Sequence, residues 1–126
     1  MIRSLLIEAT EDTPKVFFNT QNGVFEISGR SFPEDASKFY VVVLSWMQEY
    51  IQEPCMETRL HFNLEYFNST SYKQLLEILI KLKEITFTGK TVHVVWSYGK
   101  HDELMATKGE EIKDLVNMSF ELNPIE

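Results

Sequence analysis

Hydrophobic residues recur at two different periods along the chain, and each change of period marks a new element. Residues 3–8 form a short apolar run, and residues 15–20 and 23–29 are two β-rich runs separated at Asn22-Gly23. An Asn-Gly dipeptide accepts the positive φ angles of a tight hairpin turn. The pattern therefore predicts a short strand and then an antiparallel hairpin, which Gly29 ends.

From Pro33 the apolar residues recur at intervals of three and four, which is the period of a helix. Ser31 and Ser37 are candidate N-caps, and Pro54 stops the pattern after about five turns. The residues expected to face the core are Phe39, Val42, Val43, Trp46, Met47, Tyr50 and Ile51. The spacing thus predicts a long helix that packs on the hairpin.

Two later segments, residues 58–67 and 91–98, alternate between apolar and polar positions as strands do. In the first, the residues predicted to share the core face are Leu60, Phe62, Leu64 and Tyr66, and those on the other face are Arg59, His61, Asn63 and Glu65. Parallel strands that are covered on both faces usually read as continuous apolar runs. The alternation therefore predicts a sheet with one face largely open.

Two further helices are predicted from apolar stripes. The expected core residues of the first are Leu75, Leu76, Ile78, Leu79, Leu82 and Ile85, with Gly89 as its stop signal. The second begins at Asp102 and runs to about 116, with Leu104, Met105, Ile112, Leu115 and Val116 inward. Gly109 weakens this helix because glycine is a poor helix former. Residues 118–122 form a short last strand.

The order of the elements defines the fold class. Three strands are followed by helices and strands in alternation, and such units favour parallel crossovers. We therefore predict an α/β fold: a mixed sheet with an amino-terminal antiparallel hairpin and about three helices mainly on one face. At 126 residues the chain has the length of a single domain, residues 1–126.

The net charge limits the kinds of partner that the protein can bind, and the cysteine count indicates its cellular compartment. The formal net charge is −7, and binding to nucleic acid or to an anionic membrane needs clustered Lys and Arg, so neither partner is expected. No apolar run is long enough for a signal sequence or a spanning helix. Cys55 is the only cysteine, so no internal disulfide is possible, and we expect a cytoplasmic protein.

Candidate catalytic groups are few. His61 and His93 fall on the same predicted face of two strands, close to Glu65, which raises the idea of a metal or acid–base site. No paired histidine spacing or second cysteine accompanies them, so a polar cross-strand pair is the preferred interpretation. The sequence therefore predicts no enzyme activity, no metal site and no cofactor.

The junction of the first alternating strand, residues 58–67, with the helix that follows it reads YFNSTSYK, residues 66–73. One interpretation is that Asn68, Ser69 or Thr70 caps the helix and the rest forms the turn. The other is that a hydroxyl here accepts a phosphate, because free N–H groups and the positive end of the dipole lie beside it. The spacing alone leaves both interpretations open.

The chain resembles the SiaC-type regulatory phosphoproteins of bacteria. The segments that carry the resemblance are GRSFPED at 29–35, FYVVVLSWMQEYI at 39–51, LHFNLEYFNSTSYK at 60–73 and VHVVWSYGKHDELMATKGEEI at 92–112. The resemblance implies a fold similar to the STAS domains of anti-sigma-factor antagonists. It also implies a non-catalytic protein that is switched by reversible phosphorylation.

Partners and sites follow from the same resemblance. It implies a serine/threonine kinase with a histidine-kinase-type ATPase domain, a metal-dependent protein phosphatase and a diguanylate cyclase target, with an output in cyclic-di-GMP and biofilm formation. The family's acceptor position corresponds to Ser69, which stands where the family has threonine, and Thr70 is the second choice. The residues expected to contact partners are Tyr66, Phe67, Asn68, Thr70, Ser71, Tyr72 and Lys73.

Two alternatives remain at this stage. The first is an antagonist of an anti-sigma factor, which would use the same switch with a different partner. The second is a small enzyme or ligand-binding domain that uses the polar sheet face around His61 and His93.

Overall fold

A six-stranded sheet organises the molecule, and the computed structural model describes residues 2–126. The strands are β1 (Leu5–Ile7), β2 (Lys15–Asn19), β3 (Val24–Ser31), β4 (Glu57–Phe67), β5 (Thr91–Gly99) and β6 (Phe120–Ile125). The helices are α1 (Ala36–Tyr50), α2 (Ser69–Ile85) and α3 (Glu103–Val116), with a 3-10 turn, η1 (Thr86–Thr88), after α2.

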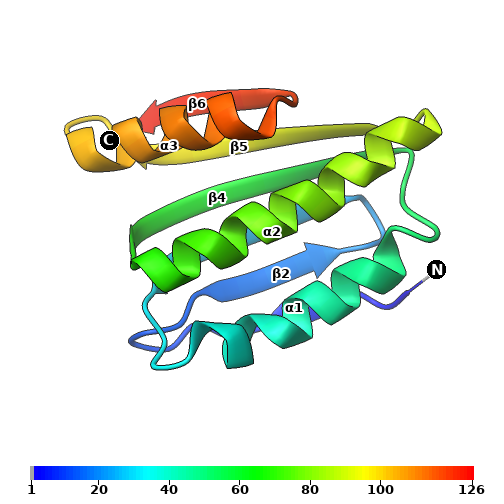
Figure 1. The fold of residues 1–126 in the computed structure, drawn as a ribbon, viewed down its shortest axis with the longest axis horizontal. Coiled ribbons are helices and arrows are strands. Elements are labelled where there is room, and N and C mark those ends of the chain that lie inside the picture. Colours follow the sequence, from blue (N-terminus) through cyan, green and yellow to red (C-terminus); the bar gives the residue numbers. More distant parts are fainter. Residues whose placement is uncertain (1) are drawn as a thin grey trace.

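The strands lie in the sheet in the order in which they occur along the chain, β1-β2-β3-β4-β5-β6. β1 pairs with β2 and β2 with β3 in antiparallel fashion, whereas β3, β4, β5 and β6 pair in parallel (Figure 1). The predicted mixed sheet with an amino-terminal hairpin is thus confirmed. Gly23 turns the hairpin with a φ of 73°.

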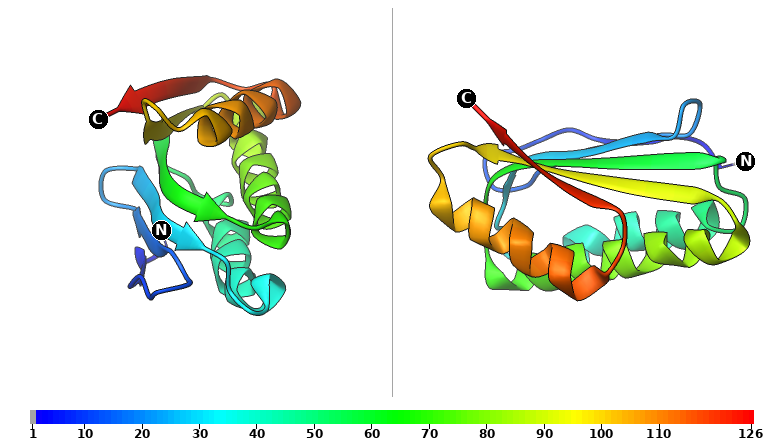
Figure 2. Two further views of the ribbon diagram at one scale, coloured as in Figure 1. Left: turned by 90° about the vertical axis from the view of Figure 1, so that its left-hand side faces the viewer. Right: turned by 90° about the horizontal axis from the view of Figure 1, so that it is seen from above.

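All three helices cover the same face of the sheet, as both views in Figure 2 show. Their apolar stripes pack on alternating residues of the central strands, and the fully buried side chains of this core include Tyr40, Met47, Leu60, Phe62, Ile78, Leu82 and Trp96. Within residues 2–126 no helix covers the other face, which confirms the open face predicted from the alternating strands. The helices begin at one end of the molecule and run in the same direction (Figure 1).

The start of α1 differs from the prediction. Asp35, and neither Ser31 nor Ser37, is the N-cap, because its carboxylate accepts the N–H of Lys38 at 3.1 Å. Ser31 cannot cap the helix because it lies at the end of β3, where it is fully buried. The helix itself has 15 residues, which is about four turns and one fewer than predicted.

Three helix residues predicted to face the core are exposed instead. Val42 is 52% exposed, Leu104 61% and Leu115 65%. Each neighbours a buried residue one position along its helix, namely Val43, Met105 and Val116. Successive helical positions are turned by about 100°, so where the covered stripe of a helix is narrow, as at these three pairs, only one member of an apolar pair reaches the core.

A bulge near the end of β3 and β4 changes the predicted orientation of Tyr66. Gly29, which has a φ of 104°, does not end β3, and the register shifts between Gly29 and Arg30. Leu64 is opposite Gly29, but Arg30 is opposite Tyr66, so β4 contributes one extra residue at this point. The alternation therefore reverses, and Tyr66 is 49% exposed whereas Leu64 is buried.

Gly109 is required by packing, although it lowers helix propensity. A Cβ atom at this position would lie 2.5 Å from Cδ1 of Trp96 and 2.8 Å from Cδ2 of Leu122. The indole N–H of Trp96 also donates to the carbonyl oxygen of Met105, one turn earlier in α3, at 3.0 Å. The missing side chain therefore allows α3 to lie directly on the Trp96 ring.

Candidate functional site: the junction of β4 and α2

Asn68 connects the end of β4 to the start of α2 and is the N-cap of the helix. Its side-chain oxygen accepts the N–H of Ser71 at 2.9 Å and the hydroxyl of Thr70 at 3.1 Å. Its own N–H donates to the carbonyl oxygen of Ser31 in β3 at 3.1 Å. One side chain therefore satisfies the capping requirement, and neither Ser69 nor Thr70 is needed for it.

Ser71 points into the protein. Its hydroxyl accepts a hydrogen bond of 2.8 Å from Ser31, whose hydroxyl lies 2.6 Å from that of Tyr40 in α1. All three side chains are fully buried. Ser71 was expected to contact partners, but its burial excludes direct contact in this conformation, and its role is to fix the first turn of α2 against β3 and α1.

Ser69 is the first residue of α2, and its side chain is exposed. Within residues 2–126 no hydrogen bond engages its hydroxyl, whereas Thr70 donates its proton to Asn68. The N–H groups of the first turn have no partner within a helix, and the positive end of the helix dipole lies at the same place. The three consecutive hydroxyls are thus in three different states: free, bonded at the surface and buried.

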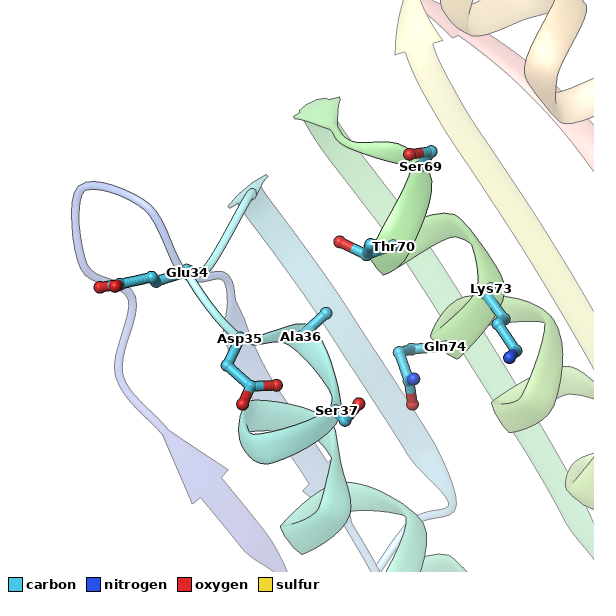
Figure 3. A pocket seen from close by; sticks show the side chains of 8 residues that line it. All are labelled: Glu34, Asp35, Ala36, Ser37, Ser69, Thr70, Lys73 and Gln74. Carbon is cyan, nitrogen blue, oxygen red and sulfur yellow. The ribbon is translucent and has the colours of Figure 1, made fainter.

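Ser69 and Thr70 line one wall of an open groove of about 570 Å³ between the amino-terminal ends of α1 and α2. Figure 3 shows the other wall, which is formed by residues 34–37. Glu34 and Asp35 bring carboxylates to that wall, and Lys73 is the only cation among the lining residues. The groove thus combines the positive ends of two helices with two acidic residues on one wall, of which Glu34 points its carboxylate away from Ser69 (Figure 3).

The aromatic residues around the junction lie on opposite sides of the sheet. Tyr66 packs edge-to-face on Phe32, with ring centroids 5.7 Å apart. Phe67 stacks on Tyr72 at 5.9 Å and contacts Trp96, which belongs to the helix-covered core. Successive strand residues point to opposite faces, so Tyr66 and Phe67 cannot belong to one continuous surface. Tyr72 is covered on its outer side by the ammonium of Lys108, 5.5 Å from the ring centroid.

His61 and His93 lie on the open face as predicted, but they are not directly opposite each other. His93 pairs in register with Arg59, and His61 with Val95, which makes the two histidines diagonal neighbours. The imidazole of His93 is held by β6 and the residue before it: Nδ1 lies 2.6 Å from the hydroxyl of Ser119, and Nε2 lies 3.2 Å from the Glu121 carboxylate.

Residues 2–126 offer neither a metal site nor a membrane-spanning helix. No group of three or more His, Cys, Asp or Glu side chains in that range is arranged to hold a metal ion. None of the helices in the same range is long and apolar enough to span a bilayer.

Sequence reasoning missed the wall of the groove opposite Ser69. Glu34 and Asp35 were noted only as residues that suit a helix start, and nothing in the sequence places them beside a serine 34 positions later. The link between Ser31 and Ser71 was also missed, because a serine in a strand carries no signal of a distant partner.

Comparison with known proteins supports a regulatory role. The model of the SiaC family of regulatory phosphoproteins matches residues 7–125. An uncharacterized protein of Pseudomonas aeruginosa strain UCBPP-PA14 is 28% identical over 116 residues, which is 92% of each chain. The crystal structure of apo-SiaC from Pseudomonas aeruginosa has a TM-score of 0.88 at 25% identity, covering 97% of this chain and 99% of that one. A second crystal structure from Pseudomonas aeruginosa shows the diguanylate cyclase SiaD in complex with its activator SiaC. It matches with a TM-score of 0.89 at 26% identity, covering 96% of this chain and 99% of that one.

Proposed function

This chain belongs to the SiaC family of regulatory phosphoproteins, and we propose that it is a non-catalytic signalling protein whose reversible phosphorylation at Ser69 switches its binding to a partner protein. The observation that carries this proposal is the state of the Ser69 hydroxyl. It is exposed and free of hydrogen bonds within residues 2–126, at the first position of a helix that Asn68 already caps.

A phosphate on Ser69 would change the charge of the groove. It adds about 1.5 to 2 negative charges, which the free N–H groups of the first turn and the dipole of α2 stabilise. Lys73, one helical turn further on, is the only cation among the lining residues. Glu34 and Asp35 on the facing wall repel the new charge. The phosphate therefore stays at the surface, where a partner senses it.

Partner release follows from the cost of burying that charge. A surface made for a neutral hydroxyl leaves a phosphate without enough donors, and an unpaired buried charge is strongly unfavourable. A loss of only about 1.4 kcal/mol lowers affinity tenfold. We assign the direct contacts to the exposed side chains of Tyr66, Ser69, Thr70 and Lys73. Asn68, Ser71, Phe67 and Tyr72 support them from within or beside the fold.

Three partners complete the proposed switch. A serine/threonine kinase with a histidine-kinase-type ATPase domain adds the phosphate, and a metal-dependent phosphatase removes it in the cytoplasm. The target in the dephosphorylated state is a diguanylate cyclase, as for the relative that activates SiaD, which connects the switch to cyclic-di-GMP and biofilm formation.

The test is the intact mass of the protein after incubation with ATP and the kinase encoded beside it. The wild type and Thr70→Ala should gain one phosphate, and Ser69→Ala should gain none. Thr70→Ala is the matched control because it removes a neighbouring hydroxyl from the same turn. Equal phosphorylation of Ser69→Ala would reject the site, and an unmodified wild type would reject the switch.

A further inference from the structure

A second pocket, of about 550 Å³, opens near the other end of α2, where β4 and β5 begin. The 17 residues of α2 separate this end of the helix from Ser69, a distance of about 25 Å at 1.5 Å per residue. The lining side chains that matter for its chemistry are Arg59, Lys83, Lys90, Val92, His93 and Met118. None of them belongs to the groove at Ser69.

Three cations converge on this pocket from three segments of an acidic chain. Lys83 lies in the last turn of α2, and within residues 2–126 no carboxylate pairs with its ammonium. The Lys90 ammonium is held in place by the carbonyl oxygen of Pro54 at 2.9 Å. Arg59 has a loose contact of 3.7 Å with Glu57, the one carboxylate among the lining residues. Among the lining residues the cations therefore outnumber the acids, in a protein whose formal net charge is −7. The Glu53 carboxylate interacts with Lys90 from outside the lining.

The rest of the lining offers donors and an apolar floor. Val92 is buried and Met118 is half-buried, so part of the pocket is apolar. The His93 ring is fixed beside it by Ser119 and by Glu121, which places a second carboxylate behind the imidazole. A pocket that combines a small number of charged groups with apolar surface suits a small organic ligand, and 550 Å³ lies in the usual size range.

An exposed aromatic residue follows one of the lining residues along the chain. Phe87 is 77% exposed, the most exposed large apolar residue in the described chain. It follows Thr86, one of the pocket's lining residues, within the short turn η1. An exposed aromatic ring is a stacking surface for any planar base.

We propose that this pocket binds a nucleotide: the phosphates contact Lys83, Lys90 and Arg59, and the base stacks on Phe87. Charge-assisted hydrogen bonds from Lys and Arg are the usual means of holding a phosphate. The site is independent of the phosphorylation of Ser69, since it lies at the other end of α2 and involves none of the same residues.

Calorimetric titration of the full, unmodified chain tests this proposal with ADP as the probe. Adenosine and inorganic pyrophosphate are titrated in parallel to separate the base from the phosphates. ADP should bind at least about tenfold more tightly than either fragment, because it makes both kinds of contact. Its affinity should fall as NaCl is raised. Absence of ADP binding would overturn the proposal, and equal binding of pyrophosphate would reduce the pocket to a bare anion site and overturn the nucleotide assignment.

Matched variants locate the site. Lys83→Gln should weaken ADP binding by about tenfold or more, the usual effect of losing one charge-assisted hydrogen bond. Phe87→Ala should weaken ADP but leave pyrophosphate unchanged. Lys38→Gln, the same change of charge on α1, should leave both affinities as in the wild type. Circular dichroism confirms that each variant is folded. An equal loss in Lys38→Gln would show a bulk charge effect and would contradict the site.

Discussion

The hydroxyl of Ser31 donates a hydrogen bond of 2.8 Å to the hydroxyl of Ser71, and both side chains are fully buried. Ser31 has one proton to donate, so the 2.6 Å contact with Tyr40 is a bond in which the phenol donates to Ser31. The chain from Tyr40 through Ser31 to Ser71 connects α1, β3 and the first turn of α2. Ser69 therefore lies in a helical turn that these buried hydrogen bonds fix to β3 and α1.

Ser31→Ala should lower the free energy of unfolding by about 1–3 kcal/mol, because it leaves the buried hydroxyls of Tyr40 and Ser71 without their shared partner. Urea denaturation measures the loss. Ser37→Ala, which removes an exposed hydroxyl from the first turn of α1, should change stability by less than about 0.5 kcal/mol. Similar losses in the two variants would show that the buried chain contributes nothing particular.

Ser69→Asp should raise stability by about 0.3–1 kcal/mol through the dipole of α2, less any repulsion from the facing carboxylates. In an Asp35→Asn background the gain should be larger, because asparagine keeps the N-cap of α1 but removes one of those charges. Thermal unfolding at low and high salt measures both effects, which salt should diminish. A gain that is unaffected by Asp35→Asn would mean that the two walls of the groove do not interact.

Gly109→Ala should destabilise the protein, although alanine is the better helix former by about 1 kcal/mol. The added Cβ would meet the Trp96 ring at 2.5 Å and Leu122 at 2.8 Å, and overpacking of this kind costs about 1–3 kcal/mol. Urea denaturation followed by tryptophan fluorescence reports both the stability and the position of the ring. Thr107→Ala on the exposed side of α3 is the control. A more stable Gly109→Ala variant would contradict the close packing of α3 on Trp96.

Alkaline pH should weaken the fold through Tyr40. Burial raises the pKa of its phenol to about 12. An unfolded tyrosine titrates near pH 10, so the folded state holds the proton more tightly. The resulting stability is complete below about pH 10 and is lost between about pH 10 and 12, at up to about 1.4 kcal/mol per pH unit.

Tyr40→Phe should flatten that dependence without abolishing it. The pKa of Tyr50 is also raised to about 12, chiefly by burial, and its contribution remains in the variant. Urea denaturation at several pH values from 9 to 11.5 compares the two slopes. An identical slope in Tyr40→Phe would show that the Tyr40 phenol does not carry the effect.

Local patterns in the sequence were sufficient for the architecture. The period of the apolar residues distinguishes strands from helices, and the alternation in β4 and β5 predicts an open sheet face, because both signals depend on neighbours only a few positions apart. Asn22-Gly23 located the hairpin for the same reason. The sequence also located the junction at residues 66–73 and supplied its cap candidates.

Only the tertiary structure decided what each side chain at that junction does. The bulge opposite Gly29 depends on the pairing of β3 with β4, and it decides that Phe67, and not Tyr66, faces the helix-covered core. Ser71 is buried against Ser31, 40 residues earlier, whose hydroxyl donates a hydrogen bond to it. Asn68 alone caps α2, which leaves the hydroxyl of Ser69 free. These contacts join segments that are distant along the chain, and no local pattern encodes which of three adjacent hydroxyls finds a distant partner.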